Sequence, residues 1–172
     1  MDADHPVLHG ERVTLRTLER SDVPRVIEIL QEPEVARWWG EHDEKRVRRD
    51  FLDDPETVAL AAETDGELIG VVMYSEENDP DYRHAGIDIT LTTVRHGHGY
   101  GTETLRLLGR YLLDERRHHR LTIDPAAANE SAIRAYEAVG FRRVGVLRNY
   151  ERGMDGSWHD GLLMDLLAGE LR

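Results

Sequence analysis

Residues 94–105, VRHGHGYGTETL, contain three glycines at alternate positions: Gly97, Gly99 and Gly101. An alternating apolar stretch precedes them and apolar residues at helical spacing follow, so they lie where a strand passes into a helix. A helix that begins in a glycine-rich turn exposes free backbone N–H groups at the positive end of its dipole, and this arrangement binds phosphate. The sequence therefore predicts a pyrophosphate site at this junction.

The spacing distinguishes this segment from two common phosphate loops. No Gly-Lys-Ser/Thr follows, as a Walker loop requires, and Gly-x-Gly-x-Gly is not the dinucleotide fingerprint. An acidic ribose contact is also missing after a second strand. One alternative stays open, in which the glycines only permit a tight turn and close packing of the helix on the strand.

The composition limits the classes of partner. The chain has 172 residues and a formal net charge of −12. We expect one domain over residues 1–172, since a domain usually has about 100–200 residues. The negative charge argues against a nucleic-acid partner, which requires clustered cations, and favours a cationic small molecule. A surplus of acid that only keeps the protein in solution is the alternative.

The chain contains no cysteine, which excludes disulfides, thiolate zinc sites and a cysteine nucleophile. No run approaches the roughly 18 apolar residues of a membrane span. Residues 1–13 lack the basic start and apolar stretch of a secretory signal. We therefore expect a cytoplasmic protein with no membrane partner.

Several segments must position the glycine loop. Apolar and polar residues alternate at 12–18 and 85–94, which predicts strands, and the second places Asp88 opposite its apolar face. Two β-rich runs are joined by Asp65-Gly66, which favours a tight hairpin. Helices are predicted from Ser21, as N-cap, to near Pro33, and over 35–52 with a break around Gly40. The remaining predicted strands are 57–64, 67–76, 120–124, 141–151 and 158–167, and the remaining predicted helix is 130–140.

Residues 95–108 (RHGHGYGTETLRLL) and 129–145 (NESAIRAYEAVGFRRVG) together resemble the GCN5-related N-acetyltransferases, the GNAT superfamily. The resemblance extends to ERVTLR, EPEVARWWG, DGELIG and the last two predicted strands. It implies an α/β GNAT fold, with a mixed, mostly antiparallel central sheet flanked by helices and strands splayed at the acetyl-CoA site. It also allows a homodimer.

By this resemblance the glycine loop holds the pyrophosphate of acetyl-coenzyme A, mainly through the amides of residues 96–102. His96 stands where the family has Gln or Arg, and Arg95 is a candidate compensating cation. The residues implied in coenzyme binding are Thr93, Val94, His96, Gly97, His98, Gly99, Tyr100, Gly101, Thr102, Asn129, Ala132 and Tyr136. Asn129 could instead serve only as a helix N-cap.

The resemblance further implies direct attack of an amine on the acetyl thioester. Tyr136 matches the family tyrosine that protonates the departing sulfur, with simple packing beside Ile133 and Val139 as the alternative. Asp88 is our first candidate for the base and Asp124 the second, either directly or through water. Holding an ammonium group is the other role open to both. The oxyanion donor is expected to be a backbone amide near the end of strand 85–94.

Two groups within the superfamily match different segments. ARWWGEHDE, DPDYRHAGID and LTIDPAAANESAIRAYEAVGF resemble aminoglycoside 6'-N-acetyltransferases, which confer antibiotic resistance. In that interpretation, which we favour, the sugar and its ammonium groups bind to Trp38, Trp39, Asp79, Asp81, Asp88 and Asp124. Residues 11–30, 98–108 and 158–167 resemble ribosomal-protein N-terminal (RimJ/RimL-like) and spermidine acetyltransferases, so a peptide or polyamine acceptor stays open.

Two further alternatives belong to other classes. The chain has nine histidines, but His96, His98, His118 and His119 fall in no metal-binding spacing such as His-Glu-x-x-His, so we expect no metal site. A catalytically silent sensor that binds acetyl-CoA or another ligand is the remaining alternative. The presence of Tyr136 and Asp88 argues against it.

Overall fold

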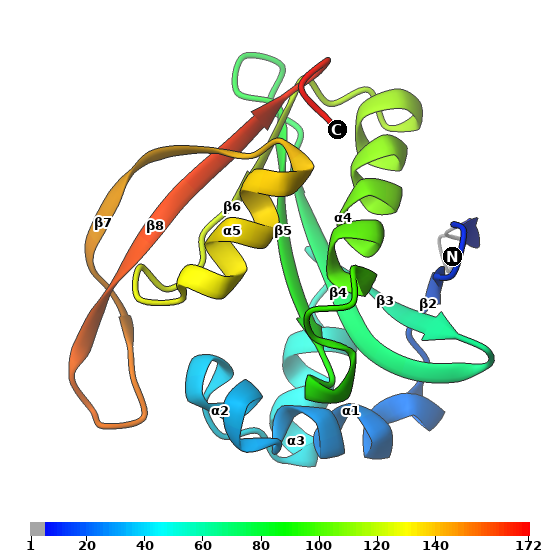
Figure 1. The fold of residues 1–172 in the computed structure, drawn as a ribbon, viewed down its shortest axis with the longest axis vertical. Helices are drawn as coiled ribbons and strands as arrows, with labels where there is room; N and C mark the ends of the chain where they lie inside the picture. Colours follow the sequence, from blue (N-terminus) through cyan, green and yellow to red (C-terminus); the bar gives the residue numbers. More distant parts are fainter. Residues whose placement is uncertain (1–5) are drawn as a thin grey trace.

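The computed structural model of the protein contains one mixed sheet of eight strands with helices on both faces (Figure 1). It describes residues 6–172. Residues 1–5, part of the segment in which we found no secretory signal, lie outside the described residues. In spatial order the strands are β1 (Leu8–His9), β2 (Thr14–Thr17), β3 (Thr57–Thr64), β4 (Glu67–Glu77), β5 (His84–Leu91), β6 (Arg120–Ile123), β8 (Trp158–Leu167) and β7 (Arg142–Arg152).

Helices connect these strands and bury two separate apolar clusters. The α-helices are α1 (Val23–Leu30), α2 (Pro33–Trp39), α3 (Glu44–Val47), α4 (Tyr100–Arg110) and α5 (Glu130–Val139). Other helical segments are η1 (Arg20–Asp22), η2 (Arg48–Leu52), η3 (Thr93–Arg95) and η4 (Tyr111–Glu115). α4 and α5 pack on one face of the sheet, whereas α1, α2 and α3 pack on the other. Within residues 6–172, no helix is both long and apolar enough to cross a membrane.

Local sequence signals account for most of these elements. The turn at Asp65-Gly66 joins β3 to β4, and both residues have positive φ, 51° and 76°. Gly40, at φ 74°, ends α2 as predicted. The side chain of Asn129 caps α5 by accepting from the N–H of Ala132 at 3.2 Å. These predicted boundaries are confirmed because each depends on residues close in sequence.

The predicted start of the first helix is wrong. Ser21 is not its N-cap; Glu19 and Asp22 form a reciprocal capping box at η1, and α1 follows directly from Asp22. The Asp22 carboxylate also accepts two hydrogen bonds from Arg16 of β2, at 2.7 and 2.9 Å. An ion pair with the preceding strand therefore favours Asp22 over Ser21 at the start of the helix.

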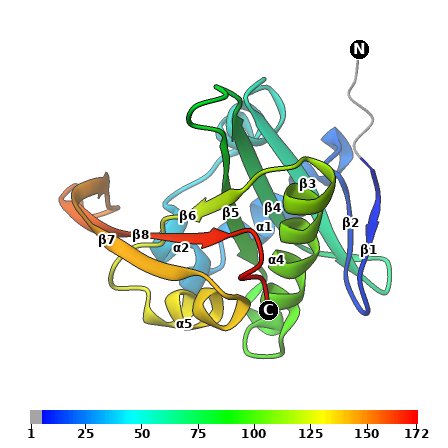
Figure 2. The ribbon, with the colours of Figure 1, turned by 90° about the horizontal axis from the view of Figure 1, so that it is seen from above.

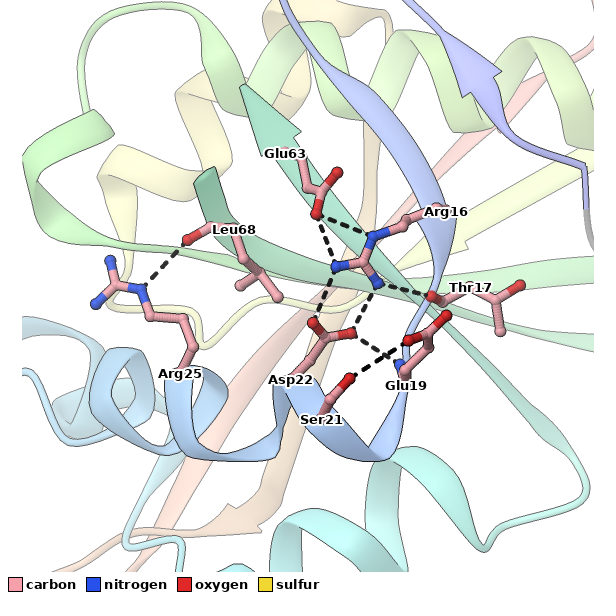
Figure 3. Close-up of polar contacts among 8 residues, drawn as sticks. All are labelled: Arg16, Thr17, Glu19, Ser21, Asp22, Arg25, Glu63 and Leu68. Carbon is pink, nitrogen blue, oxygen red and sulfur yellow. Dashed lines mark hydrogen bonds and ion pairs between the residues drawn. The ribbon is translucent and has the colours of Figure 1, made fainter. Parts of the chain in front are cut away.

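Arg16 connects three elements on this side of the sheet (Figure 3). Its guanidinium donates to Asp22, to Glu63 of β3 at 2.7 Å, and to the Thr17 carbonyl at 3.1 Å. Hydrogen bonding to Arg16, acting against burial, lowers the pKa of Asp22. The network anchors the base of α1 to β2 and β3.

β5 and β6 are parallel but pair over only two residue pairs, Ala85 with Leu121 and Gly86 with Thr122. Beyond these pairs the strands separate. β5 continues alongside β4 up to Leu91, and β6 ends at Ile123. The predicted splaying of the strands is confirmed, and α4 and α5, which follow the two strands, flank the opening (Figure 2).

Candidate active site

A cavity of about 710 Å³ occupies the opening between β5 and β6. β5 contributes Asp88 to Leu91 to its wall, and the end of β6 with the following turn contributes residues 123–126. α5 lines a further wall through Asn129, Ala132 and Tyr136, and the glycine loop lies at one end. The separation of two adjacent strands therefore creates the space in which the predicted residues meet.

Asp88 projects into this cavity from β5. It is paired with Met73 across the β4–β5 ladder, which places its side chain on the face covered by α1 to α3. Its surface remains open to the cavity, while protein atoms surround it on the other sides. This burial, followed by the carboxylates of Asp124 and Glu151, raises the pKa of Asp88 to about 6. Near neutral pH the group is therefore a carboxylate that accepts a proton readily.

Asp124 and Glu151 complete an acidic cluster with Asp88. Asp124 follows β6 and also lines the cavity. Glu151 comes from β7, far away in the sequence, and was not predicted. Burial and the charge of Asp124 raise the pKa of Glu151, with His159 acting in the opposite direction. Three carboxylates of like charge in one cavity form an environment suited to a cationic ligand.

Tyr136 reaches the cavity from the opposite face of the sheet. Its neighbours on α5, Ile133 and Val139, are buried in the core, whereas Tyr136 lines the cavity and its ring lies 6.4 Å from that of Phe141. Burial, followed by the charges of Asp88 and Asp124, raises the pKa of the Tyr136 phenol above its usual value. The phenol is therefore protonated at neutral pH and can donate a hydrogen bond or its proton.

The glycine loop offers a series of free amides. None of the backbone N–H groups from Gly97 to Thr102 donates to another main-chain group of residues 6–172. Gly97 and Gly99 have φ of 73° and 83°, and Gly99 is the N-cap of α4. Left-handed glycines in a turn at a helix N-terminus are typical of phosphate-binding loops.

One predicted cradle amide is not available. The N–H of His96 donates to the Thr93 carbonyl at 3.0 Å. The His96 ring bonds the Leu91 carbonyl at 2.9 Å and so ties the loop to the end of β5. Arg95 lines the cavity but pairs with Glu67 at 3.2 Å. The His96 side chain, which stands where the family has Gln or Arg, therefore makes a structural contact with β5.

Free amides also lie along β5. The N–H of Thr92 donates to the Ile69 carbonyl of β4 at 2.8 Å. Because hydrogen-bonded pairs alternate along an antiparallel ladder, the amides of Ile89 and Leu91 point away from β4, toward the opening. They are candidates for the backbone donor that the sequence predicts near the end of this strand.

Glu32 connects the two halves of the site and was also not predicted. Its carboxylate accepts from the Thr92 hydroxyl and from the N–H and hydroxyl of Thr93, each at 2.7 Å. Burial raises the pKa of Glu32, but these hydrogen bonds outweigh it and hold the pKa below its usual value. Since Glu32 is the N-cap of α2, its charge anchors the start of that helix to the glycine loop.

A second, larger cavity of about 1190 Å³ adjoins the first. Trp38, Trp39 and Glu151 line both cavities, and α2 and the β7–β8 hairpin form opposite walls of the second one. Both elements lie at the same end of the molecule (Figure 1). A molecule in the second cavity therefore has access to the acidic cluster past the indole rings of Trp38 and Trp39.

Some predicted site residues lie elsewhere. Asp79 and Asp81 are exposed in the loop before β5, where Asp79 accepts from the N–H of Asp81 at 2.9 Å, and neither lines either of these two cavities. The structure does not bring them to the site. Four residues in or next to the cradle do not line the cavity: Thr93, Val94, His98 and Tyr100.

Tyr100 is instead part of a cationic contact behind the loop. The guanidinium of Arg12 lies 4.4 Å from the centre of its ring and donates to the His98 carbonyl at 3.0 Å. Arg12 comes from the chain before β2, and no local pattern in the sequence indicates this contact.

Comparison with known proteins agrees with this geometry. The family model for the acetyltransferase (GNAT) domain matches residues 12–142. Aminoglycoside N(6')-acetyltransferase type 1 of Klebsiella pneumoniae is 29% identical over 158 residues, which cover 80% of this chain and 78% of that protein. Spermidine N(1)-acetyltransferase of Escherichia coli K12 is 28% identical over 158 residues, covering 88% and 84%.

Solved structures show the same fold. The structure of AAC(6')-Ib in complex with paromomycin and acetyl-CoA matches with a TM-score of 0.77 at 26% identity, over 92% of this chain and 94% of that one. The predicted resemblance is thus confirmed in sequence, over more than half of the chain, and in fold. The chain belongs to the GNAT family and is an acetyl-CoA-dependent N-acetyltransferase.

Proposed function

We propose that this acetyltransferase acts on the 6'-amine of an aminoglycoside antibiotic, an activity of the resistance type. The proposal rests on the composition of the region shared by the two cavities. Trp38 and Trp39 line both cavities, and the first cavity also contains the carboxylates of Asp88, Asp124 and Glu151. Indole rings stack on the apolar faces of sugars, and carboxylates hold ammonium groups. Relatives with this activity support the assignment.

We assign the coenzyme to the first cavity, between β5 and β6. Its pyrophosphate is assigned to the amides of Gly97 to Thr102, since they are free and lie at the N-terminus of α4. Its pantetheine arm then lies in the opening between β5 and β6, beside Asn129 and Ala132. Bound there, acetyl-CoA supplies a thioester that an amine can attack.

The residues around the opening divide the proton transfers. Asp88 takes the proton from the attacking amine, because it lines the opening and its raised pKa suits a general base. The Ile89 or Leu91 amide donates to the carbonyl oxygen as it gains negative charge. The C–S bond breaks as the C–N bond forms, and Tyr136 donates a hydrogen bond or its proton to the sulfur. Asp124 holds the amine in place.

A polyamine is the second candidate acceptor. The spermidine acetyltransferase relative covers 88% of this chain, more than the aminoglycoside enzyme does. The same three carboxylates suit a linear polycation, for which the indole walls have no special use. Substrate comparison separates the two candidates directly.

We expect aminoglycosides with a 6'-amine to be the fastest substrates. Thiol release from acetyl-CoA, followed with a chromogenic disulfide reagent, is measured for kanamycin-type antibiotics, spermidine and an N-terminal ribosomal peptide. An aminoglycoside with a hydroxyl at the 6' position is the matched negative control. A larger kcat/KM for spermidine or the peptide assigns the site to that acceptor and rejects the antibiotic.

The pH dependence tests Asp88. We expect kcat/KM to fall as the pH decreases through about 6, where Asp88 becomes protonated. Asp88→Asn should lower kcat/KM by about 100- to 10,000-fold, the usual contribution of a general base, and remove this acid limb. An unchanged limb in the variant means that another group is titrating.

Stability provides a second measurement on the same variant. The pKa of Asp88 is higher in the folded protein than its usual value, so its contribution to stability is present at low pH and lost as the pH rises through about 6. Asp88→Asn should therefore melt at a higher temperature than the wild type at pH 8, with a smaller difference near pH 4. Equal melting curves at pH 8 argue against a destabilising charge at this position.

Replacement of Tyr136 tests the donor. Tyr136→Phe keeps the ring beside Phe141 and removes only the hydroxyl. We expect kcat to fall by about 100-fold or more, with little change in the KM for acetyl-CoA or in the melting temperature. If kcat stays within twofold of the wild type, Tyr136 serves only for packing.

Replacement of Gly99 tests the cradle. Gly99 has a positive φ of 83°, which valine rarely adopts, and a Cβ at this position would lie 3.1 Å from Arg12 Nη2. Gly99→Val should therefore displace the amides and raise the KM for acetyl-CoA at least tenfold. Gly145→Val is the matched control, because no atom lies within 4 Å of a Cβ there. An unaltered coenzyme KM in Gly99→Val rejects the pyrophosphate assignment.

A further inference from the structure

The β7–β8 ladder contains a large irregularity next to the acidic cluster. Leu147 opposes Gly161 and Glu151 opposes His159, so β7 advances four residues where β8 advances two. Within this bulge Asn149 has a φ of 48°, and its N–H donates to Oδ1 of Asp160 at 2.8 Å. Asparagine is among the residues that adopt this conformation most readily. A side chain of β8 therefore holds the bulge in place.

The bulge brings two consecutive side chains of β7 to the same site. In a regular strand, neighbours point to opposite faces of the sheet. Here Glu151 lines the cavity with Asp88, and the hydroxyl of Tyr150 donates to Oδ2 of Asp124 at 2.5 Å. Re-aiming of a side chain beside an active site is a common result of a bulge.

Gly161 lets the Tyr150 ring cross β8. A Cβ at Gly161 would lie 2.8 Å from Cδ1 of Tyr150, closer than two carbon atoms normally approach. Gly161 also forms a bridge with Ala126, in the turn that follows Asp124. The missing side chain therefore opens a path from β7 to Asp124.

The hydroxyl of Tyr150 is a donor and Asp124 is its acceptor. The hydrogen bond to Asp124, followed by burial, raises the pKa of Tyr150 to about 12, so the phenol keeps its proton at neutral pH. Within residues 6–172, no other hydrogen bond holds the Asp124 carboxylate. Tyr150 thus occupies one carboxylate oxygen and leaves the other free to bind a ligand.

We propose that Tyr150 is a positioning residue for the acceptor: through its hydrogen bond it orients Asp124 so that the free carboxylate oxygen binds the ammonium group of the amine. This inference rests on the proposed role of Asp124 as the group that holds the amine. Tyr150 lines neither of the two cavities of the site, so it acts only through Asp124.

Tyr150→Phe isolates the hydroxyl, because phenylalanine keeps the ring over Gly161. We expect the KM for the amine to rise about tenfold, as befits the loss of a hydrogen bond to a charged group, with kcat and the KM for acetyl-CoA within about threefold of the wild type. Tyr82→Phe is the matched control, since Tyr82 is 74% exposed in the loop before β5. An unchanged amine KM in Tyr150→Phe overturns the proposal.

A double-mutant cycle tests whether Tyr150 acts through Asp124. Asp124→Asn should itself raise the KM for the amine, and Tyr150→Phe added to it should have little further effect. A full tenfold further rise in the double variant would mean that the two residues act independently, which rejects the proposal.

Gly161→Ala perturbs the same contact without removing the hydroxyl. We expect its new methyl group to displace the Tyr150 ring and to reproduce the higher amine KM of Tyr150→Phe. Gly145→Ala is the control on β7, where a Cβ has no atom within 4 Å. A wild-type amine KM in Gly161→Ala contradicts a requirement for the ring position.

Failure of the proposed function and failure of the role of Tyr150 give different results in these experiments. If spermidine or a peptide proves to be the better acceptor, the antibiotic assignment fails, and the same cycle is measured with that amine. A crystal structure of Tyr150→Phe needs no acceptor at all. We expect the Asp124 carboxylate to leave its wild-type orientation there, and its retention overturns the positioning role.

Discussion

The site depends on the brief pairing of β5 with β6. Parallel strands that paired along their full length would satisfy each other's backbone groups and close the sheet. Here they share two residue pairs and then separate, which leaves the amides of Ile89 and Leu91 without strand partners and opens a cavity through the sheet. Groups from opposite faces, Asp88 from one and Tyr136 from the other, can meet only in such an opening.

Polar contacts between distant segments keep this opening in shape. Glu32 ties the start of α2 to the end of β5 and the beginning of the glycine loop, and Glu103 of α4 accepts from the backbone N–H groups of Arg12 and Val13 at 2.6 and 2.9 Å. Each carboxylate satisfies several donors at once, which offsets the cost of its partial burial. These contacts tie α2 and the segment before β2 to the two ends of the glycine loop.

The acidic cluster illustrates the conflict between stability and function. Three carboxylates in one cavity repel one another, and burial adds to the cost of their charges, as the raised pKa values of Asp88 and Glu151 indicate. A cationic acceptor relieves this repulsion when it binds. In the function that we propose, this relief favours the binding of amines, and the raised pKa of Asp88 suits the proton transfer that follows.

The sequence by itself determined the local features: the hairpin at Asp65-Gly66, the cap of α5 at Asn129 and the glycine junction between β5 and α4. Each follows from the conformational preferences of a few adjacent residues. The sequence motifs shared with the family further pointed to Asp88, Asp124 and Tyr136. The sequence did not reveal that Asp22 rather than Ser21 precedes α1, because an ion pair with Arg16 makes that choice. It also placed Asp79 and Asp81 with the site, although they lie in the loop before β5. Only the tertiary structure brought Glu32, Tyr150 and Glu151 to the site, since the bulge in β7 and the separation of two strands join residues that no short-range spacing relates.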